Sequence, residues 1–274
     1  MIKKRVFPGL RIDDFIHNED QKFYSNDKDS ASLVEKGLEL LNDASVLLAR
    51  EVTLGRYVEV TEHNCPRLVN ILKNVCKILD FNQMPGIYLH HEAEQYTLAL
   101  GSNRLHILVS EYALECYDDD MLYFILGNAV TMFKGGHTTL NTICNLSGGL
   151  KIAYPVKLVL LKKLRAADLT SDRGGLLACQ SFDAAARCIL MSMGYPHSDL
   201  IRLNTDELTN VVEAVIHNEE QTDYGGLLGD AAVSLIRVNM ISSPAGIKLK
   251  ELYDWYRTGY KTLYESGRES YEWD

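Results

Sequence analysis

Residues 126–137 read LGNAVTMFKGGH and form the middle of an apolar stretch with helical character. Three consecutive carboxylates, Asp118, Asp119 and Asp120, precede this stretch. Carboxylates at the start of a helix accept hydrogen bonds from its free N–H groups and oppose its dipole. We therefore expect a helix that begins at the acidic run and carries residues 126–137 as part of the core.

Regular patterns continue on both sides of this helix. Apolar residues recur at helical spacing over residues 31–53 and 65–79, and helical patterns broken by Gly and Pro continue to about residue 261. Short β-branched and aromatic runs at 87–90, 96–100 and 105–110 predict three strands, the last two joined by a hairpin at Gly101-Ser102-Asn103. Residues 18–30 are rich in Asn, Asp, Ser and Lys and indicate a surface loop.

These elements predict an α+β fold, mainly α-helical, with one small β-sheet in a single domain of residues 1–274. We expect an N-terminal helical segment at about 1–84, the sheet at about 85–111 and helices over 112–274. Tyrosines of the C-terminal part recur at helical spacing at Tyr253, Tyr256, Tyr260 and Tyr264. They predict a helix whose aromatic face packs on the core, with a protein interface as the alternative.

Composition excludes several classes of protein. A net charge of −9 would repel a phosphate backbone, so nucleic acid is not an expected partner. We expect neither a signal peptide nor membrane insertion, because no apolar run approaches the roughly 20 residues that cross a bilayer. The six cysteines lack CxxC pairs and indicate reduced thiols in a soluble, cytoplasmic protein.

Two stretches carry a resemblance to a known family. LGNAVTMFKGGH at 126–137 resembles the LGHELGHxxxGH motif of the HtpX and CAAX prenyl protease family of zinc metallopeptidases. RAADLTSDRGGL at 165–176 is similar to that family's second metal helix, RxxELxADRxGL, and Ser243-Pro244 followed by Lys248 resembles a late segment that often begins His-Pro. The resemblance, closest to soluble bacterial members, implies a zincin-like metallopeptidase fold of the gluzincin type.

At the positions that this resemblance marks as the zinc site, the chemistry has changed. A hydrolytic zinc site on a helix needs two histidines at i and i+4 and a glutamate beside the first. Here these positions hold Asn128, Met132 and Ala129, and Thr131 stands where the pattern has glycine. Asp168 stands at the glutamate ligand and is shorter by about 1.5 Å, against a tolerance of about 0.2 Å. We therefore expect no catalytic residue, no metal ligand set and no cofactor.

A residual cleft is expected where the family binds its substrate. Its candidate residues are Tyr96, Thr97, Leu98, His137, Asp168 and Asp172. His137 matches a histidine that is not a ligand, so a structural hydrogen bond is the favoured role and binding the alternative. Asp168 and Asp172 are one helical turn apart, and we expect them to pair with Arg165 or Arg173.

The leading hypothesis is a pseudopeptidase that binds a peptide or protein partner, with an extended segment added to the strand at 96–100. One alternative is an active metallopeptidase with a rebuilt site, for which His106, His137 and Asp168 are candidate ligands. Another is a structural subunit of a complex. The adjacent His90 and His91 are expected to mark a strand end, because neighbouring residues of a strand point to opposite faces.

Overall fold

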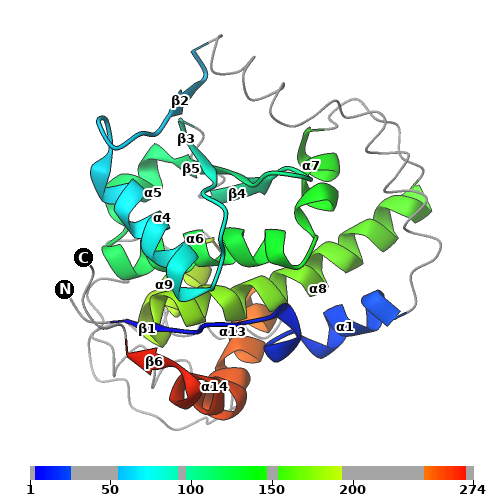
Figure 1. The fold of residues 1–274 in the computed structure, drawn as a ribbon. Coiled ribbons are helices and arrows are strands. Elements are labelled where there is room, and N and C mark those ends of the chain that lie inside the picture. Colours follow the sequence, from blue (N-terminus) through cyan, green and yellow to red (C-terminus); the bar gives the residue numbers. More distant parts are fainter. Residues whose placement is uncertain (1–3, 26–54, 92–96, 147–153, 193–243, 270–274) are drawn as a thin grey trace, which may run out of the picture.

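The computed structural model describes residues 4–25, 55–91, 97–146, 154–192 and 244–269. Its helices are α1 (Asn18–Ser25), α4 (Pro66–Ile78), α5 (Glu111–Cys116), α6 (Asp119–Lys134), α7 (Thr138–Leu146), α8 (Tyr154–Cys179), α9 (Phe182–Ser192), α13 (Pro244–Trp255) and α14 (Lys261–Ser266), with a 3₁₀ turn at Ile12–Asp14 and a π-helical turn at Tyr256–Tyr260. The strands are β1 (Arg5–Val6), β2 (Tyr57–Glu59), β3 (Gly86–His90), β4 (Thr97–Leu100), β5 (His106–Ser110) and β6 (Arg268–Glu269). The described part is mainly helical (Figure 1).

The larger sheet is small and mixed, with the strand order β2-β3-β5-β4. Strands β3 and β5 run parallel, whereas β2 and β4 are antiparallel to their neighbours. Every residue of the inner strand β5 is buried, and β4 forms one edge of the sheet. The hairpin from β4 to β5 requires glycine at Gly101, which has φ +113° and where a Cβ would lie 1.9 Å from the carbonyl oxygen of Arg104.

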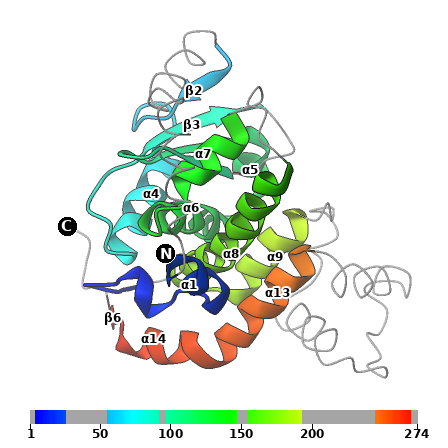
Figure 2. The same ribbon diagram turned by 90° about the vertical axis from the view of Figure 1, so that its right-hand side faces the viewer.

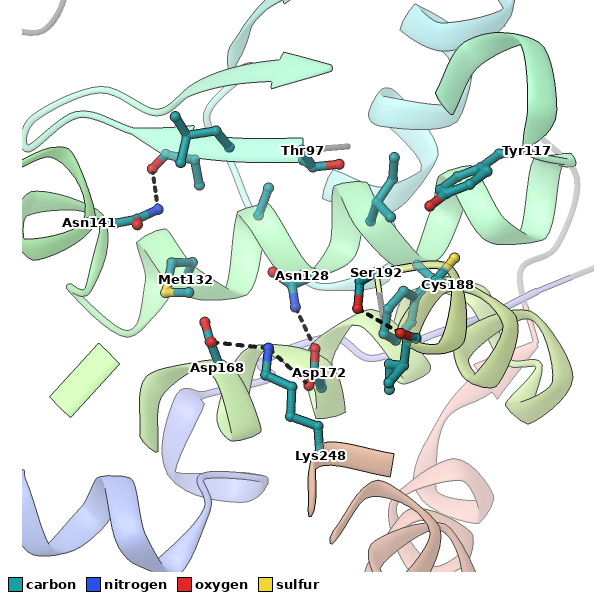
Figure 3. Close-up of a pocket in the computed structure, with 16 residues that line it drawn as sticks. Thr97, Tyr117, Asn128, Met132, Asn141, Asp168, Asp172, Cys188, Ser192 and Lys248 are labelled. Carbon is teal, nitrogen blue, oxygen red and sulfur yellow. Dashed lines mark hydrogen bonds and ion pairs between the residues drawn. The ribbon is translucent and has the colours of Figure 1, made fainter. Parts of the chain in front are cut away.

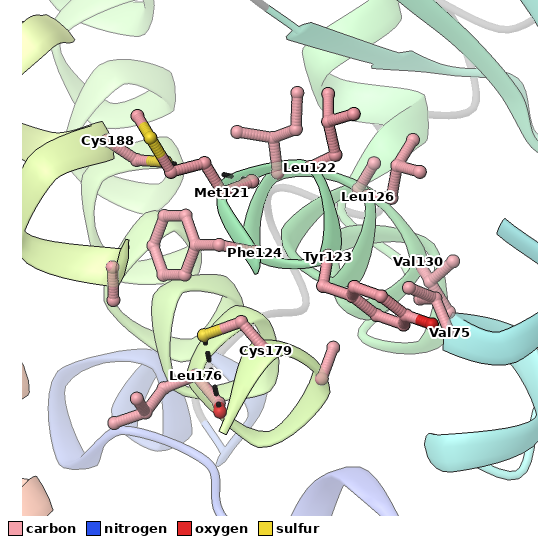
Figure 4. Packing of buried hydrophobic residues seen from close by; sticks show 14 of the residues in the cluster. Val75, Met121, Leu122, Tyr123, Phe124, Leu126, Val130, Leu176, Cys179 and Cys188 are labelled. Atoms are coloured by element: carbon pink, nitrogen blue, oxygen red, sulfur yellow. Dashed lines mark hydrogen bonds between the residues drawn. The ribbon is translucent and has the colours of Figure 1, made fainter. Parts of the chain in front are cut away.

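Helix α6 forms the centre of the core. Its N-cap is Asp118, whose side chain accepts a hydrogen bond of 2.8 Å from the backbone N–H of Met121. Most of the residues from Met121 to Met132 are buried, because α6 packs against α4, α8, α9 and β4. Figure 4 shows the apolar side chains that this helix and its neighbours bury together.

Small residues let α6 and α8 approach each other closely. A Cβ at Gly127 of α6 would lie 2.4 Å from the Cβ of Ala178, and a Cβ at Gly174 of α8 would lie 1.8 Å from Thr131 Oγ1. The β-branched Thr131 is fully buried and fills the space that Gly174 leaves open. The β-branched Thr131 of α6 and the glycine of α8 therefore fix how closely the two helices cross.

The elements stack in layers around α6 and α8. The four-stranded sheet and α7 lie on one side of α6, and α8 lies on the other (Figures 1 and 2). Helix α13 packs against both α8 and α9, and α1 packs against α8. Residues of α13 thus return to α8, which carries one of the motif-like stretches.

Strands β1 and β6 form a separate antiparallel ribbon that joins segments near the two ends of the described chain. Gln180 follows α8 and acts as a third partner of this ribbon. Its Oε1 accepts a hydrogen bond of 2.8 Å from the N–H of Arg5, and its Nε2 donates one of 2.7 Å to the carbonyl of the same residue. Gln180 has φ +54°, an unfavourable value for a residue with a side chain.

Several expectations from the sequence are confirmed. Helix α4 lies within residues 65–79, α6 begins after the acidic run, and the three predicted strands are β3, β4 and β5 with the expected hairpin. The predicted packing of the C-terminal tyrosines is also found, since Tyr260 is buried and its ring lies 5.3 Å from that of Tyr256 and 5.4 Å from that of Tyr264. The helix predicted at 31–53 lies outside the described residues.

One expectation is wrong, and one strand was not expected. Residues 18–25 form helix α1 instead of a loop, because the buried carboxylate of Asp20 is bound by side chains of the core. The strand β2 was not predicted, and it pairs with β3 although two of its three residues are exposed. Among the described helices, none combines the length and the apolar character that crossing a bilayer requires.

Candidate functional site

A cavity of about 360 Å³ lies between the edge strand β4 and helices α6, α8, α9 and α13 (Figure 3). Strand β4 contributes Thr97, Leu98 and Ala99, and α6 contributes Asn128, Ala129 and Met132. Asp168, Asp172 and Lys248 complete its polar part. Most of the residues that the sequence marked are thus brought together around one cavity.

Of the described candidate residues, one is not part of this lining. Tyr96 lies outside the described residues. His137 is buried, and its Nε2 donates a hydrogen bond of 3.0 Å to Asp20 Oδ2, which also accepts one of 2.6 Å from Thr170 Oγ1. His137 therefore binds α1 to the end of α6 and is not among the described residues that face the cavity.

The polar part of the cavity is a cluster of Asn128, Asp168, Asp172 and Lys248 (Figure 3). Lys248 Nζ lies 3.0 Å from Asp168 Oδ2 and 3.9 Å from Asp172 Oδ2. Asn128 Nδ2 donates a hydrogen bond of 2.8 Å to Asp172 Oδ1. A residue of α6, two of α8 and one of α13 therefore form one connected group.

The expected pairing of these carboxylates with Arg165 or Arg173 is wrong. Arg173 Nη1 donates hydrogen bonds to the carbonyl oxygens of Phe15 and Ile16, at 3.2 and 2.9 Å, and its guanidinium lies over the ring of Trp255. Arg165 is exposed. The aspartates instead have the lysine of α13 as their cation, because that helix packs across α8 at their level.

The electrostatics of the cluster are dominated by burial. Asp172 is only 4% exposed, and burial raises the pKa of its carboxyl group to about 6, although Lys248 opposes this shift. Burial lowers the pKa of Lys248, but the attraction of Asp172 and Asp168 outweighs this effect and leaves the lysine pKa above its ordinary value. The ammonium group is therefore charged at neutral pH.

Two oxygen atoms at the cavity lack a hydrogen-bond partner among the described residues. They are Asp172 Oδ2 and Thr97 Oγ1, and both are buried. An unsatisfied buried oxygen costs about 1–3 kcal/mol, more when it is charged. A ligand that donates hydrogen bonds in this cavity would remove that cost.

The other part of the cavity is apolar. It is lined by Tyr117, Phe124, Ile125, Cys188 and Ile189. Burial raises the pKa of the Cys188 thiol well above its ordinary value, so this sulfur is protonated and is not a nucleophile. This end of the cavity is suited to an apolar side chain.

The outer edge of β4 borders the cavity. Asn141 of α7 donates a hydrogen bond of 2.9 Å to the carbonyl of Ala99, and Thr142 Oγ1 accepts one of 2.9 Å from the N–H of Gly101. In an antiparallel pair, the backbone groups of alternate residues point to the same side. The backbone groups of Thr97 therefore point to the same outer side as the carbonyl of Ala99. Among the described elements, α7 contacts this edge at Ala99 and Gly101.

The alternative metal ligand set is not assembled. Within the described ranges, no three His, Cys, Asp or Glu side chains gather into a group that could hold a metal ion, so His106, His137 and Asp168 do not meet. Of the adjacent histidines, His90 ends β3, and His91 is exposed with its Nδ1 2.7 Å from Glu111 Oε2.

Two site residues were missed by the sequence analysis. The charge of Lys248 could not be assigned to Asp168 and Asp172, because nothing in the spacing of the sequence shows that α13 returns to α8. Asn141 belongs to a short helix whose contact with β4 is likewise tertiary. The only signal for Lys248 is its place in the late segment after Ser243-Pro244.

Comparison with known proteins adds one likeness. No protein-family model matches the chain, and no solved structure matches it significantly. A curated protein of Arabidopsis thaliana, the chloroplastic plastoglobule-localized metallopeptidase 48, is 24% identical over 271 residues, which cover 94% of this chain and 77% of that protein. The chain is thus similar over most of its length to a metallopeptidase, and this distant relationship supports the description of the chain as peptidase-like.

Proposed function

We propose that this chain is a pseudopeptidase: a non-catalytic protein with a zincin-like scaffold that binds an extended segment of a peptide or protein along β4. The proposal rests on one observation above all. A cavity beside the edge strand of the sheet holds two buried oxygens without hydrogen-bond partners among the described residues, at Asp172 and Thr97, while the positions that should carry hydrolytic chemistry hold other residues.

The donor chemistry does not fit zinc. Zinc in proteins takes imidazole, thiolate or carboxylate ligands, and a neutral amide or a thioether is a poor substitute. The cavity presents Asn128, Met132 and Asp168 at these positions. The ammonium group of Lys248 lies 3.0 Å from Asp168 Oδ2, so a second cation there would meet charge repulsion.

The residue at the general-base position supports the same proposal. Ala129 is 1% exposed and lines the cavity next to Asn128. Its methyl group can neither accept a proton nor orient a water molecule. Asp172 is held by Asn128 and Lys248, so it is positioned to hold charge and to accept hydrogen bonds from a ligand.

Binding along β4 would use backbone and cavity together. The outward groups of Thr97 offer main-chain hydrogen bonds to an added strand, which supply affinity without regard to sequence. The apolar part near Phe124 and Ile189 would take one side chain, and Asp172 Oδ2 would accept from a donor. The cavity would therefore favour peptides in which an apolar residue lies close to a residue whose side chain donates a hydrogen bond.

A second candidate function is peptide hydrolysis, and the metallopeptidase named above favours it. Elemental analysis of protein purified without a metal-affinity tag, followed by a fluorogenic-peptide assay with and without zinc, separates the two. Near-stoichiometric zinc with chelator-sensitive cleavage would overturn the non-catalytic proposal. We expect neither.

Binding is tested with an immobilised peptide library and two matched variants. Ser192 is exposed and lines the cavity, so Ser192→Trp should fill its mouth without disturbing the core. Leu161→Trp, at an exposed position of α8 outside the lining, is the control. We expect sequence-dependent binding at micromolar concentration that Ser192→Trp weakens at least tenfold and the control leaves unchanged. Absent or sequence-independent binding would refute the proposal.

A further inference from the structure

We propose that the ammonium group of Lys248 is the resident cation of the cavity and takes the place, in charge, of a metal ion. The inference comes from geometry. Asp168 and Asp172 lie one turn apart on α8, and Lys248 reaches both from α13, at 3.0 and 3.9 Å. A positive charge held by two carboxylates beside the α6 helix is the arrangement that a bound metal ion would otherwise supply.

The lysine is built into the site. Its side chain is 28% exposed, whereas that of Asp172 is 5% exposed. Leu249 and Leu252, its neighbours on α13, are buried in the core and fix the helix that carries it. The cation therefore belongs to the fold and cannot be exchanged with solvent as a metal ion can.

Removal of the ammonium group should create a site for a divalent cation. The carboxylates of Asp168 and Asp172 would then be uncompensated. The Asn128 amide, whose Nδ2 donates to Asp172 Oδ1, would supply a third oxygen if it turned by 180° toward the ion. Three oxygen donors suit a hard ion such as Mn²⁺ or Mg²⁺ better than zinc. Asp172 Oδ2, which has no hydrogen-bond partner among the described residues, would be an available ligand.

The proposal goes beyond peptide binding and does not depend on it. It concerns what neutralises the acidic pair, and its test uses Mn²⁺ and no peptide. A failure of one proposal therefore leaves the other standing.

The experiment compares thermal unfolding with and without MnCl₂, at constant ionic strength, and counts bound Mn²⁺ by electron paramagnetic resonance. Wild type and Lys248→Arg should bind no Mn²⁺ and show no shift in Tm. Lys248→Met should unfold about 6 °C or more lower, because the buried carboxylate of Asp172 loses its counter-charge, and should recover with about one Mn²⁺ bound per chain.

A triple variant, Lys248→Met with Asp168→Asn and Asp172→Asn, supplies the decisive control. It should regain most of the lost Tm without Mn²⁺, and added Mn²⁺ should not change its Tm, because no carboxylate charge is left at these two positions. Stoichiometric Mn²⁺ with a raised Tm in wild type would overturn the proposal, as would a Lys248→Met variant that is fully stable without the ion. If Lys248→Met does not fold, the triple variant decides: failure to regain stability would show that only the packing of the lysine stem matters.

Discussion

Asp172 is a buried carboxylate whose ionisation opposes folding. Burial raises its pKa from 3.8 to about 6, so the folded protein holds this proton more tightly than the unfolded chain does. A raised folded-state pKa means that stability is lost as pH rises from about 4 to about 6, by up to about 3 kcal/mol for this group. Relative to wild type, Asp172→Asn should therefore gain stability over this pH range.

The measurement is the difference in unfolding free energy between variant and wild type, taken from urea titrations at several pH values. The amide that replaces the carboxylate would keep an oxygen that can accept from Asn128 Nδ2, so the packing should be preserved. Asp254→Asn, an exposed position of α13, is the control and should leave the difference constant. Parallel pH profiles for Asp172→Asn and wild type would contradict the prediction.

The side chain of Gln180 makes the two hydrogen bonds that a neighbouring strand would make to the backbone of Arg5. Because it makes both backbone-type hydrogen bonds to Arg5, Gln180→Ala should cost about 2 kcal/mol. Gln180→Gly loses the same two bonds but relieves the φ of +54°. It should therefore be up to about 1 kcal/mol more stable than Gln180→Ala in urea unfolding. Equal stability of the two variants would show that the backbone at this position is not strained.

The contact between α6 and α8 depends on the pairing of Thr131 with Gly174. Gly174→Ala should cost about 1–3 kcal/mol, because its methyl group would lie 1.8 Å from Thr131 Oγ1. Thr131→Gly should remove most of this clash when combined with Gly174→Ala. A double-mutant cycle in urea should therefore show a coupling of about 1 kcal/mol or more, and additive effects would contradict the proposed contact.

Elements with a strong local signal could be predicted from the sequence. The period of α4, the acidic cap of α6 and the hairpin at Gly101 are local properties, and all three are found. Strand β2 has three residues and a mostly exposed pattern, so it carries no alternation to detect. Helix α1 has a polar sequence, and only its contacts with the core make it a helix rather than a linker.

The candidate site was predictable in its residues but not in its pairing. Asn128, Met132, Asp168 and Asp172 were found because motif-like spacing marked them, and the structure places them around one cavity. The sequence predicts an arginine of α8 as their cation, whereas the structure places Lys248 of α13 there. A salt bridge between distant segments leaves no periodic trace in a sequence.

At the level of the whole molecule, Asp20 joins the N-terminal segment to the core. It is fully buried and accepts hydrogen bonds from His137 and Thr170, while the N–H of His17 also reaches Thr170 Oγ1. Asp20→Ala should therefore cost about 2–3 kcal/mol and release α1. Limited proteolysis should then cut the N-terminal segment faster, whereas Asp13→Ala, at an exposed position, should not change the rate.

Because Lys248 lies on α13, it is synthesised after the two aspartates that it neutralises. Ribosomes deliver a protein from its N-terminus, so Asp168 and Asp172 emerge well before the lysine that neutralises them. Until α13 arrives, a nascent chain that has already paired α6 with α8 holds two carboxylates one turn apart on α8 without a counter-charge. A translation pause or a premature stop between α9 and α13 would therefore leave the two carboxylates without their counter-charge.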